Sequence, residues 1–278
     1  MSRNINFHQT FKPEKLYIGR ILRELPSCNG KNLEEISAIT GIPVGKSSGK
    51  VEPTISYAEY MGLLKKHKNA GEFYLSYTDL GKCVLKEDAT LLEKLSLLLL
   101  HIMLVRKYSG ADVWSYIFMD IFPKYDTVVP LKYISKEIEL KFGDNVDLNP
   151  FKKSYQELFA TLKLFSVEEN ELHLNKLRID EDYVYLYAVA LYKFWDEWLE
   201  YSTDDEVQTA SSMEITASAL KKTGFREAFL WNERDEYDVL ELLASEGIID
   251  LNRQMVPITI RRVVEYTFLL EKLYSRLC

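Results

Sequence analysis

The stretch MGLLKKHKNAGEFYLSYT, residues 61–78, decides the fold class that we expect. Its two short runs of strand-forming residues flank Asn69 and Gly71, and turn residues between two such runs predict a β-hairpin. Three helices are expected upstream, within residues 12–25, 32–41 and 52–64, because apolar residues recur there at helical spacing. Helix, helix, helix, hairpin is the order of a winged helix, whose third helix usually enters a DNA groove while the hairpin forms the wing.

The same local pattern recurs twice, in ATLKLFSVEENELHLNKL (160–177) and in LLASEGIIDLNRQMVPITI (242–260). Each copy has an apolar helix end, a short strand, a polar turn and a returning strand. Helices are expected before the copies at 131–142 and 150–164, and at 213–222, 226–231 and 233–245. A spacing of roughly 100 residues indicates separate modules and not a solenoid.

We therefore expect a mainly α fold, made of tandem winged-helix-type modules with short β-hairpin wings joined by long buried helices. The joining helices are expected at 91–107 and 183–201, where apolar and aromatic residues are dense, and a last helix at 260–277. The expected domains are a winged-helix DNA-binding-like domain (1–88), a helical domain that can hold a second winged helix (89–202) and a C-terminal winged-helix-like domain (203–278).

The cysteines and the apolar runs indicate a cytoplasmic protein without a membrane segment. Cys28, Cys83 and Cys278 lie far apart and form no CxxC pair, which fits a reducing compartment and argues against a zinc knuckle. The first residues lack the apolar core of a signal peptide. The longest apolar stretch, 95–105, is too short to cross a bilayer.

Charge is unevenly spread along the chain. The formal net charge is −7, yet residues 1–86 carry 13 Lys and Arg against 8 Asp and Glu, while the remaining residues carry 22 against 34. An N-terminal module of opposite sign to the rest indicates an anionic partner for that module.

The loop GIPVGKSSGK (41–50) follows a helix and does not have the spacing of a phosphate-binding loop of nucleotide hydrolases. It is either a solvated turn or a loop whose amides and lysines meet a DNA phosphate. In the DNA-binding interpretation five lysines contact phosphates, namely Lys46, Lys50, Lys65, Lys66 and Lys68. Four further residues face the groove in that interpretation, namely Ser47, Ser48, Thr54 and Tyr57.

No catalytic centre, metal site or cofactor is expected from the residue pattern. His8, His67, His101 and His173 lack the i, i+4 spacing of a zinc helix, and His101 lies within an apolar helix, where a hydrogen-bonded core role is expected. The runs at 204–206 and 235–236 are expected to be surface carboxylates. The tyrosine-rich stretch 183–195 is expected to pack between helices instead of stacking on bases.

The opening Phe7-His8-Gln9-Thr10-Phe11 is similar to the Phe-x-x-His-Glu-Thr-Phe opening of a bacterial family catalogued as domain of unknown function 4007. The segment Gly41-Ile-Pro-Val-Gly-Lys46 resembles that family's Leu-Gly-Val-Gly-Lys-Asn segment. The matching positions are His8, Thr10, Phe11, Gly45 and Lys46. Proteins of this kind tend to be encoded beside phosphoadenosine-phosphosulfate-reductase-like proteins, so the resemblance implies an accessory role in DNA modification or phage defence.

The leading hypothesis is a non-enzymatic, double-stranded-DNA-binding accessory subunit of a bacterial DNA-modification or anti-phage system, such as DNA phosphorothioation. Its protein partner would be a phosphoadenosine-phosphosulfate-reductase-like protein or another defence protein. The alternatives are a protein-interaction scaffold within such a complex, an ordinary winged-helix transcription regulator, and an enzyme that cuts nucleic acid or uses nucleotides.

Charge also predicts a division of labour between the modules. Residues 1–88 are expected to carry the DNA contact, because the acidic remainder repels DNA from its own surface. A minor second contact is left open at Arg253, Arg261 and Arg262.

Overall fold

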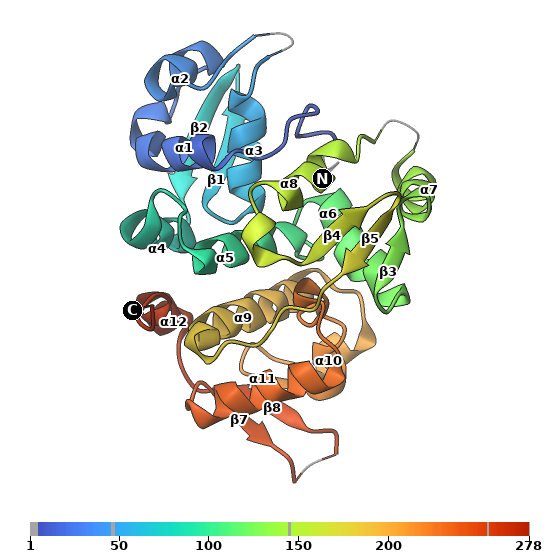
Figure 1. Cartoon of the computed structure of the whole chain (residues 1–278). Helices are drawn as coiled ribbons and strands as arrows, with labels where there is room; N and C mark the ends of the chain where they lie inside the picture. Colours follow the sequence, from blue (N-terminus) through green and yellow to red (C-terminus); the bar gives the residue numbers. More distant parts are fainter. Residues whose placement is uncertain (1–4, 46–47, 144–145, 255, 278) are drawn as a thin grey trace.

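The computed structural model describes residues 5–45, 48–143, 146–254 and 256–277. Over these residues the chain has a mainly α fold with small antiparallel sheets (Figure 1).

The first unit contains the helices and the hairpin that the sequence predicts. Its elements are α1 (Lys15–Cys28), α2 (Leu33–Thr40), α3 (Val51–Tyr60), β1 (Leu64–Asn69), β2 (Glu72–Tyr77) and α4 (Asp79–Asp88). Asn32 and Glu35 begin α2 as a reciprocal capping box, in which each side chain accepts the other's backbone N–H. Gly41 ends α2 in the left-handed conformation, with a φ of 66°.

The middle of the chain contains the second hairpin. Its elements are α5 (Lys94–Val105), α6 (Asp112–Tyr116), η1 (Ile117–Ile121), η2 (Phe122–Lys124), β3 (Val128–Pro130), α7 (Leu131–Phe142), α8 (Asn149–Gln156), η3 (Ala160–Leu162), β4 (Phe165–Glu168) and β5 (Glu171–Leu174). The helix expected to reach residue 164 ends at Gln156, and η3 follows as a separate turn. Strand β3 has only three residues, too few to show a period of two in the sequence.

The last part of the chain contains the third hairpin. Its elements are η4 (Glu181–Tyr183), α9 (Val184–Tyr201), η5 (Asp205–Thr209), β6 (Glu214–Thr216), α10 (Ala217–Leu220), η6 (Glu227–Phe229), α11 (Glu233–Ser245), β7 (Ile249–Asn252), β8 (Thr259–Arg262) and α12 (Tyr266–Lys272). The expected helix 213–222 is wrong in its first half, because β6 pairs there with β8. The expected last helix 260–277 is wrong at its start for the same reason, since β8 precedes α12.

The three series share one order of elements. In each, a short extended segment follows the first helix, precedes the helix pair, and pairs antiparallel with the second strand of the hairpin. Lys31 makes a single bridge to Phe73 of β2, β3 pairs with β5, and β6 pairs with β8. The second and third sheets therefore have matching orders, β3-β5-β4 and β6-β8-β7.

Two long helices form the centre of the molecule, as the sequence predicts. Every residue of α5 from Leu95 to Val105 is buried, and most of α9 is buried as well. Helix α9 packs against α5, α11 and α12, so it also serves as the first helix of the third series. In Figure 1 the first two series lie above this centre and the third lies below it.

Candidate nucleic-acid interface

Helix α3, the expected DNA-reading helix of the first unit, is enclosed by its neighbours. Val51 and the run from Pro53 to Ala58 are buried. Its partly exposed residues include Glu52 and Glu59, whose carboxylates pair with Lys68 and Lys66 of β1. A helix covered on most sides cannot enter a groove. Helix α3 therefore acts as a core helix.

Thr54 and Tyr57, which were expected to face a groove, are buried inside the first unit. Their exposed fractions are 6% and 1%. The Thr54 hydroxyl donates to the Lys50 carbonyl (2.6 Å), and the Tyr57 hydroxyl donates to the Phe11 carbonyl (2.9 Å). Both side chains hold α3 in place because each bonds a backbone group of the segment before it.

Three of the expected phosphate-binding lysines are held by carboxylates. Lys50 Nζ lies 2.6 Å from Glu14, and Lys68 Nζ lies 2.8 Å from Glu52. Lys66 Nζ lies 3.1 Å from Glu59 and also donates to the Ser56 hydroxyl. Such half-exposed pairs contribute about 0–1 kcal/mol, so a phosphate could replace the carboxylates, but the pairs neutralise the local charge.

The alternation of strand β1 also separates the hairpin lysines. Lys66 and Lys68 pair in register with Leu75 and Phe73, whose side chains are buried, and they reach toward α3. Lys65 stands on the opposite face of the strand and is exposed. The strand therefore places Lys65 on a different face from Lys66 and Lys68.

The loop between α2 and α3 is closed by its own backbone. The Gly49 N–H donates to the Gly45 carbonyl, and the Lys50 N–H donates to the Pro43 carbonyl. Gly45 has a φ of 150°, and a Cβ on Gly49 would lie 2.6 Å from the Gly45 oxygen. Ser48 is exposed in this loop. Lys46 and Ser47 lie outside the described residues.

The N-terminal motif forms an arm that packs onto α3 and α6. The Phe7 ring is 4% exposed and lies 4.6 Å from the Tyr60 ring and 5.9 Å from the Trp114 ring, centroid to centroid. His8 is buried, and its Nδ1 accepts the Thr10 N–H. Burial lowers the pKa of His8 to about 4. These contacts give the motif a structural role, in which Phe11 contributes the carbonyl that Tyr57 bonds.

Helix α8 carries a polar, basic face that is not among the sequence-predicted sites. Asn149, Lys152, Lys153 and Gln156 are exposed or half-exposed, and they follow the i, i+3, i+4, i+7 spacing of one helix face. The opposite side is buried through Pro150, Phe151, Ser154 and Tyr155. No carboxylate occurs within α8. We call the four residues the α8 face; its signal in the sequence is the strict amphipathic spacing around Lys152 and Lys153.

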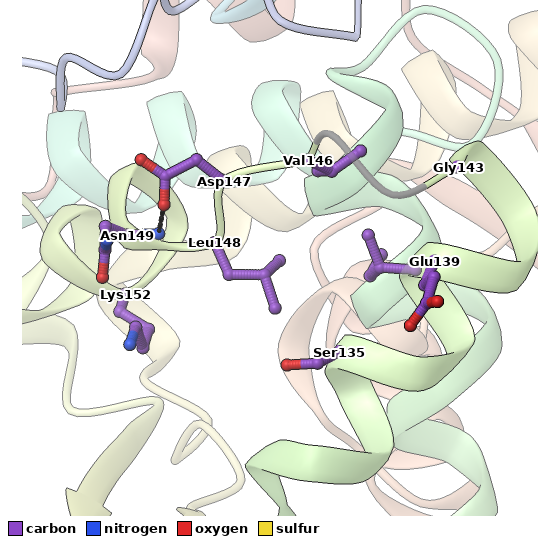
Figure 2. Close-up of a pocket in the computed structure, with 9 residues that line it drawn as sticks. Ser135, Glu139, Gly143, Val146, Asp147, Leu148, Asn149 and Lys152 are labelled. Carbon is purple, nitrogen blue, oxygen red and sulfur yellow. Dashed lines mark hydrogen bonds between the residues drawn. The ribbon is translucent and has the colours of Figure 1, made fainter.

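A groove of about 320 Å³ lies beside this face, between α7 and α8 (Figure 2). Asn149 and Lys152 line it from α8, while Ser135 and Glu139 line it from α7. The Asp147 side chain accepts the Asn149 N–H (2.8 Å) and so fixes the first turn of α8. The groove therefore offers both donors and acceptors next to the α8 face.

The matching helix of the third unit, α11, has the opposite character. It carries five carboxylates and one arginine. The arginines left open as a second contact are engaged: Arg253 bonds Glu241 and Arg261 bonds Asp250. Arg262 is a structural residue, since its guanidinium lies 4.3 Å from the Trp195 ring centroid and 2.7 Å from Asp196. The exposed surface of α11 is therefore acidic.

The described part of the chain contains no group of three or more His, Cys, Asp or Glu placed to hold a metal ion. His101 is fully buried and hydrogen-bonded, as expected. Cys28 and Cys83 are free thiols, and burial raises the pKa of each to about 11. No described helix is long and apolar enough to span a membrane.

Comparison with known proteins shows a shared fold. No family model matches the chain, and a search of curated proteins finds no match. A magnesium-ion-bound crystal structure of SspB matches with a TM-score of 0.68 and 18% identity, covering 97% of this chain and 86% of that one. A second SspB crystal structure matches with a TM-score of 0.69 and 17% identity over the same shares. At this identity the match establishes similarity of fold alone.

Proposed function

We propose that this chain is a non-enzymatic, DNA-binding accessory protein of a bacterial DNA-modification or phage-defence system, and that it holds duplex DNA through the α8 face. The observation that carries the proposal is the single exposed stripe of Asn149, Lys152, Lys153 and Gln156. Lysine neutralises phosphates and bonds guanine, while Asn and Gln can bond adenine in the major groove. Of the three matching helices, α3 is enclosed and α11 is acidic, which leaves α8.

The shared order of elements supports a winged-helix interpretation. In that fold the helix before the hairpin reads DNA, and α8 has this place in the middle series. We therefore propose three winged-helix-type units with the DNA contact in the second. The lysines of the first unit, Lys65 and Lys68 among them, would supply flanking phosphate contacts.

The acidic tip of the second hairpin meets the start of α7. The Asn170 carbonyl at this tip accepts the Leu131 N–H, and the groove is lined along α7 from Ser135 to Gly143. The proposed DNA contact therefore lies on the α8 side of the groove, at Asn149 and Lys152.

The biological setting of the proposal comes from two resemblances. SspB, whose fold this chain shares, is a phosphorothioation-system protein. The N-terminal motif resembles domain of unknown function 4007, whose members accompany phosphoadenosine-phosphosulfate-reductase-like proteins. Both support a cytoplasmic role beside a DNA-modifying partner of that class.

The test is duplex binding, measured by fluorescence anisotropy at two salt concentrations. The variant Lys152→Ala with Lys153→Ala should bind at least about tenfold more weakly at low salt, because two phosphate contacts are lost, and its affinity should depend less on salt. The matched control is Lys82→Ala with Lys86→Ala on α4, two exposed lysines far from α8, which should bind as the parent does. Equal losses in the two variants, or no binding by the parent, would contradict the proposal.

The proposal that the chain is not an enzyme has its own test. Incubation of the full chain with supercoiled plasmid and Mg²⁺ should leave the plasmid intact. Nicking or cleavage that a single carboxylate substitution abolishes would show an enzyme and would overturn this part.

A further inference from the structure

A cavity of about 750 Å³ lies between the middle and the last parts of the chain, away from the α8 face. Phe122 and Tyr125 line it from the segment after η1, and Trp231 lines it from the start of α11. Leu230 takes a left-handed φ of 56°, which turns the chain so that Trp231 meets the cavity. The Trp231 indole is fixed by its N–H bond to the Leu177 carbonyl (2.7 Å) and by stacking on Phe229.

Carboxylates outnumber cations around this cavity. Asp126, Glu227 and Glu233 line it, together with two cations, Arg226 and Lys176. Both cations are already engaged, because Lys176 pairs with Asp235 (2.8 Å) and Arg226 donates to Glu227 Oε1 (2.9 Å). Among the described residues, the lining itself therefore carries a net negative charge.

One wall carboxylate has an unsatisfied oxygen. Glu227 Oε2 is buried and has no hydrogen-bond partner among the described residues, although Oε1 accepts two bonds from Arg226. Glu236, which lies 4.0 Å behind Arg226, also has a buried oxygen without a partner. An unsatisfied buried acceptor destabilises the folded chain, so a hydrogen-bond donor supplied by a ligand would stabilise it.

We propose that this cavity receives an arginine side chain from a basic segment of a partner protein. A guanidinium is planar, donates to carboxylates and stacks on aromatic rings, which matches Glu227 together with Tyr125 and Trp231. The volume is that of a ligand pocket and admits the side chain with its flanking backbone. Duplex DNA does not fit the same place, because the surrounding carboxylates repel phosphates. This inference is independent of the DNA contact at α8.

The experiment uses the full chain labelled with 5-fluorotryptophan and fluorine NMR. The Trp231 signal is assigned with Trp231→Phe, and the probe is the capped peptide acetyl-Gly-Arg-Gly-amide. The control peptide carries citrulline, which has the shape of arginine without its charge. Titration with the arginine peptide should shift the Trp231 signal and leave those of Trp114 and Trp198, which are buried elsewhere, unchanged.

Loss of the Glu227 carboxylate should weaken binding of the arginine peptide at least about tenfold. The reason is that a charge-assisted hydrogen bond of about 1.5 kcal/mol or more is removed. The variant is Glu227→Gln, and Asp126→Asn on the facing segment is a second variant that does not disturb Arg226. The control is Asp238→Asn, an exposed position of α11 that does not line the cavity.

Equal binding of the citrulline peptide, or no Trp231 shift at millimolar arginine peptide, would overturn the proposal. So would a Trp231 shift produced only by an oligonucleotide. The DNA contact at α8 is tested with other variants and with duplex DNA. Failure of either proposal therefore does not affect the test of the other.

Discussion

His101 joins three parts of the chain through one buried imidazole. Its Nδ1 bonds the Tyr155 hydroxyl and its Nε2 bonds the Ala228 carbonyl, each at 2.9 Å. Burial lowers the pKa of His101 to about 4, so the ring is neutral at physiological pH. We expect His101→Phe to lower the free energy of unfolding by about 2–4 kcal/mol, because two buried polar groups lose their partner. Urea unfolding followed by circular dichroism measures this.

Tyr155→Phe is the comparison for that change. It removes one of the two bonds and preserves the ring, so it should cost about 1 kcal/mol. A His101 variant as stable as the parent would show that the imidazole does not hold these parts together.

Glu236 makes stability depend on pH. Burial raises its pKa from 4.5 to about 7, against the opposing effect of Arg226. The folded state therefore binds the proton more tightly than the unfolded state, and the stability from this group is lost as pH rises from 4.5 through 7. At about pH 8 we expect Glu236→Gln to be more stable than the parent, with a free energy of unfolding higher by up to about 3 kcal/mol. The difference should vanish near pH 5.

Differential scanning calorimetry at the two pH values checks this expectation. Glu214→Gln, at an exposed position of β6, is the control and should leave the pH dependence unchanged. A constant difference between the Glu236 variant and the parent at both pH values would contradict the assignment of the proton to Glu236.

At the scale of elements, the N-terminal arm is expected to stabilise the junction of the first and second units. Phe7 contacts rings of both, Tyr57 and Tyr60 on α3 and Trp114 on α6. Phe7→Ala should therefore cost about 3 kcal/mol of unfolding free energy, the usual effect of deleting a buried ring. Leu16→Ala, at a position 57% exposed, should change it by less than about 0.5 kcal/mol. Thermal unfolding of both variants measures these changes. A Phe7→Ala variant as stable as Leu16→Ala would show that the arm does not stabilise the junction.

The sequence predicts the longer elements because they carry strong local signals. Capping at Asn32, the left-handed glycine at Gly41 and the turn at Asn69 to Gly71 locate α2 and the first hairpin correctly. The short strands β3 and β6 carry no such signal, since their pairing with the hairpins is set by contacts distant in the chain. Tertiary pairing therefore replaces the helix that was expected to begin at residue 213.

The candidate site is harder to predict because exposure depends on packing between units. A helix that carries Thr54 and Tyr57 has polar groups suited to a groove, yet the arm and the hairpin cover it. The lysines at 65, 66 and 68 are adjacent in sequence but alternate between the faces of β1. Lys152 and Lys153 do not stand out in the sequence because the second copy of the repeat has the weakest local pattern.

At the scale of the whole molecule, the three units present different surfaces. The first presents lysines that are paired with carboxylates, the second presents the α8 face, and the third presents the acidic α11. The division of labour expected from charge alone placed DNA on residues 1–88. We propose instead that DNA binds the second unit and that a basic protein segment binds the cavity beside α11.

The central claim, that α8 is the DNA contact, is tested most directly by charge reversal in each unit, with duplex affinity as the readout. The variants are Lys152→Glu with Lys153→Glu in the second unit, Lys65→Glu with Lys68→Glu in the first, and Arg253→Glu with Arg261→Glu in the third. Arg262 is left unchanged because it holds β8 against α9. We expect the first pair to remove most of the affinity, the second to remove a smaller part and the third almost none. A larger loss from the Lys65 and Lys68 pair than from the Lys152 and Lys153 pair would contradict the account and return the DNA contact to the N-terminal unit.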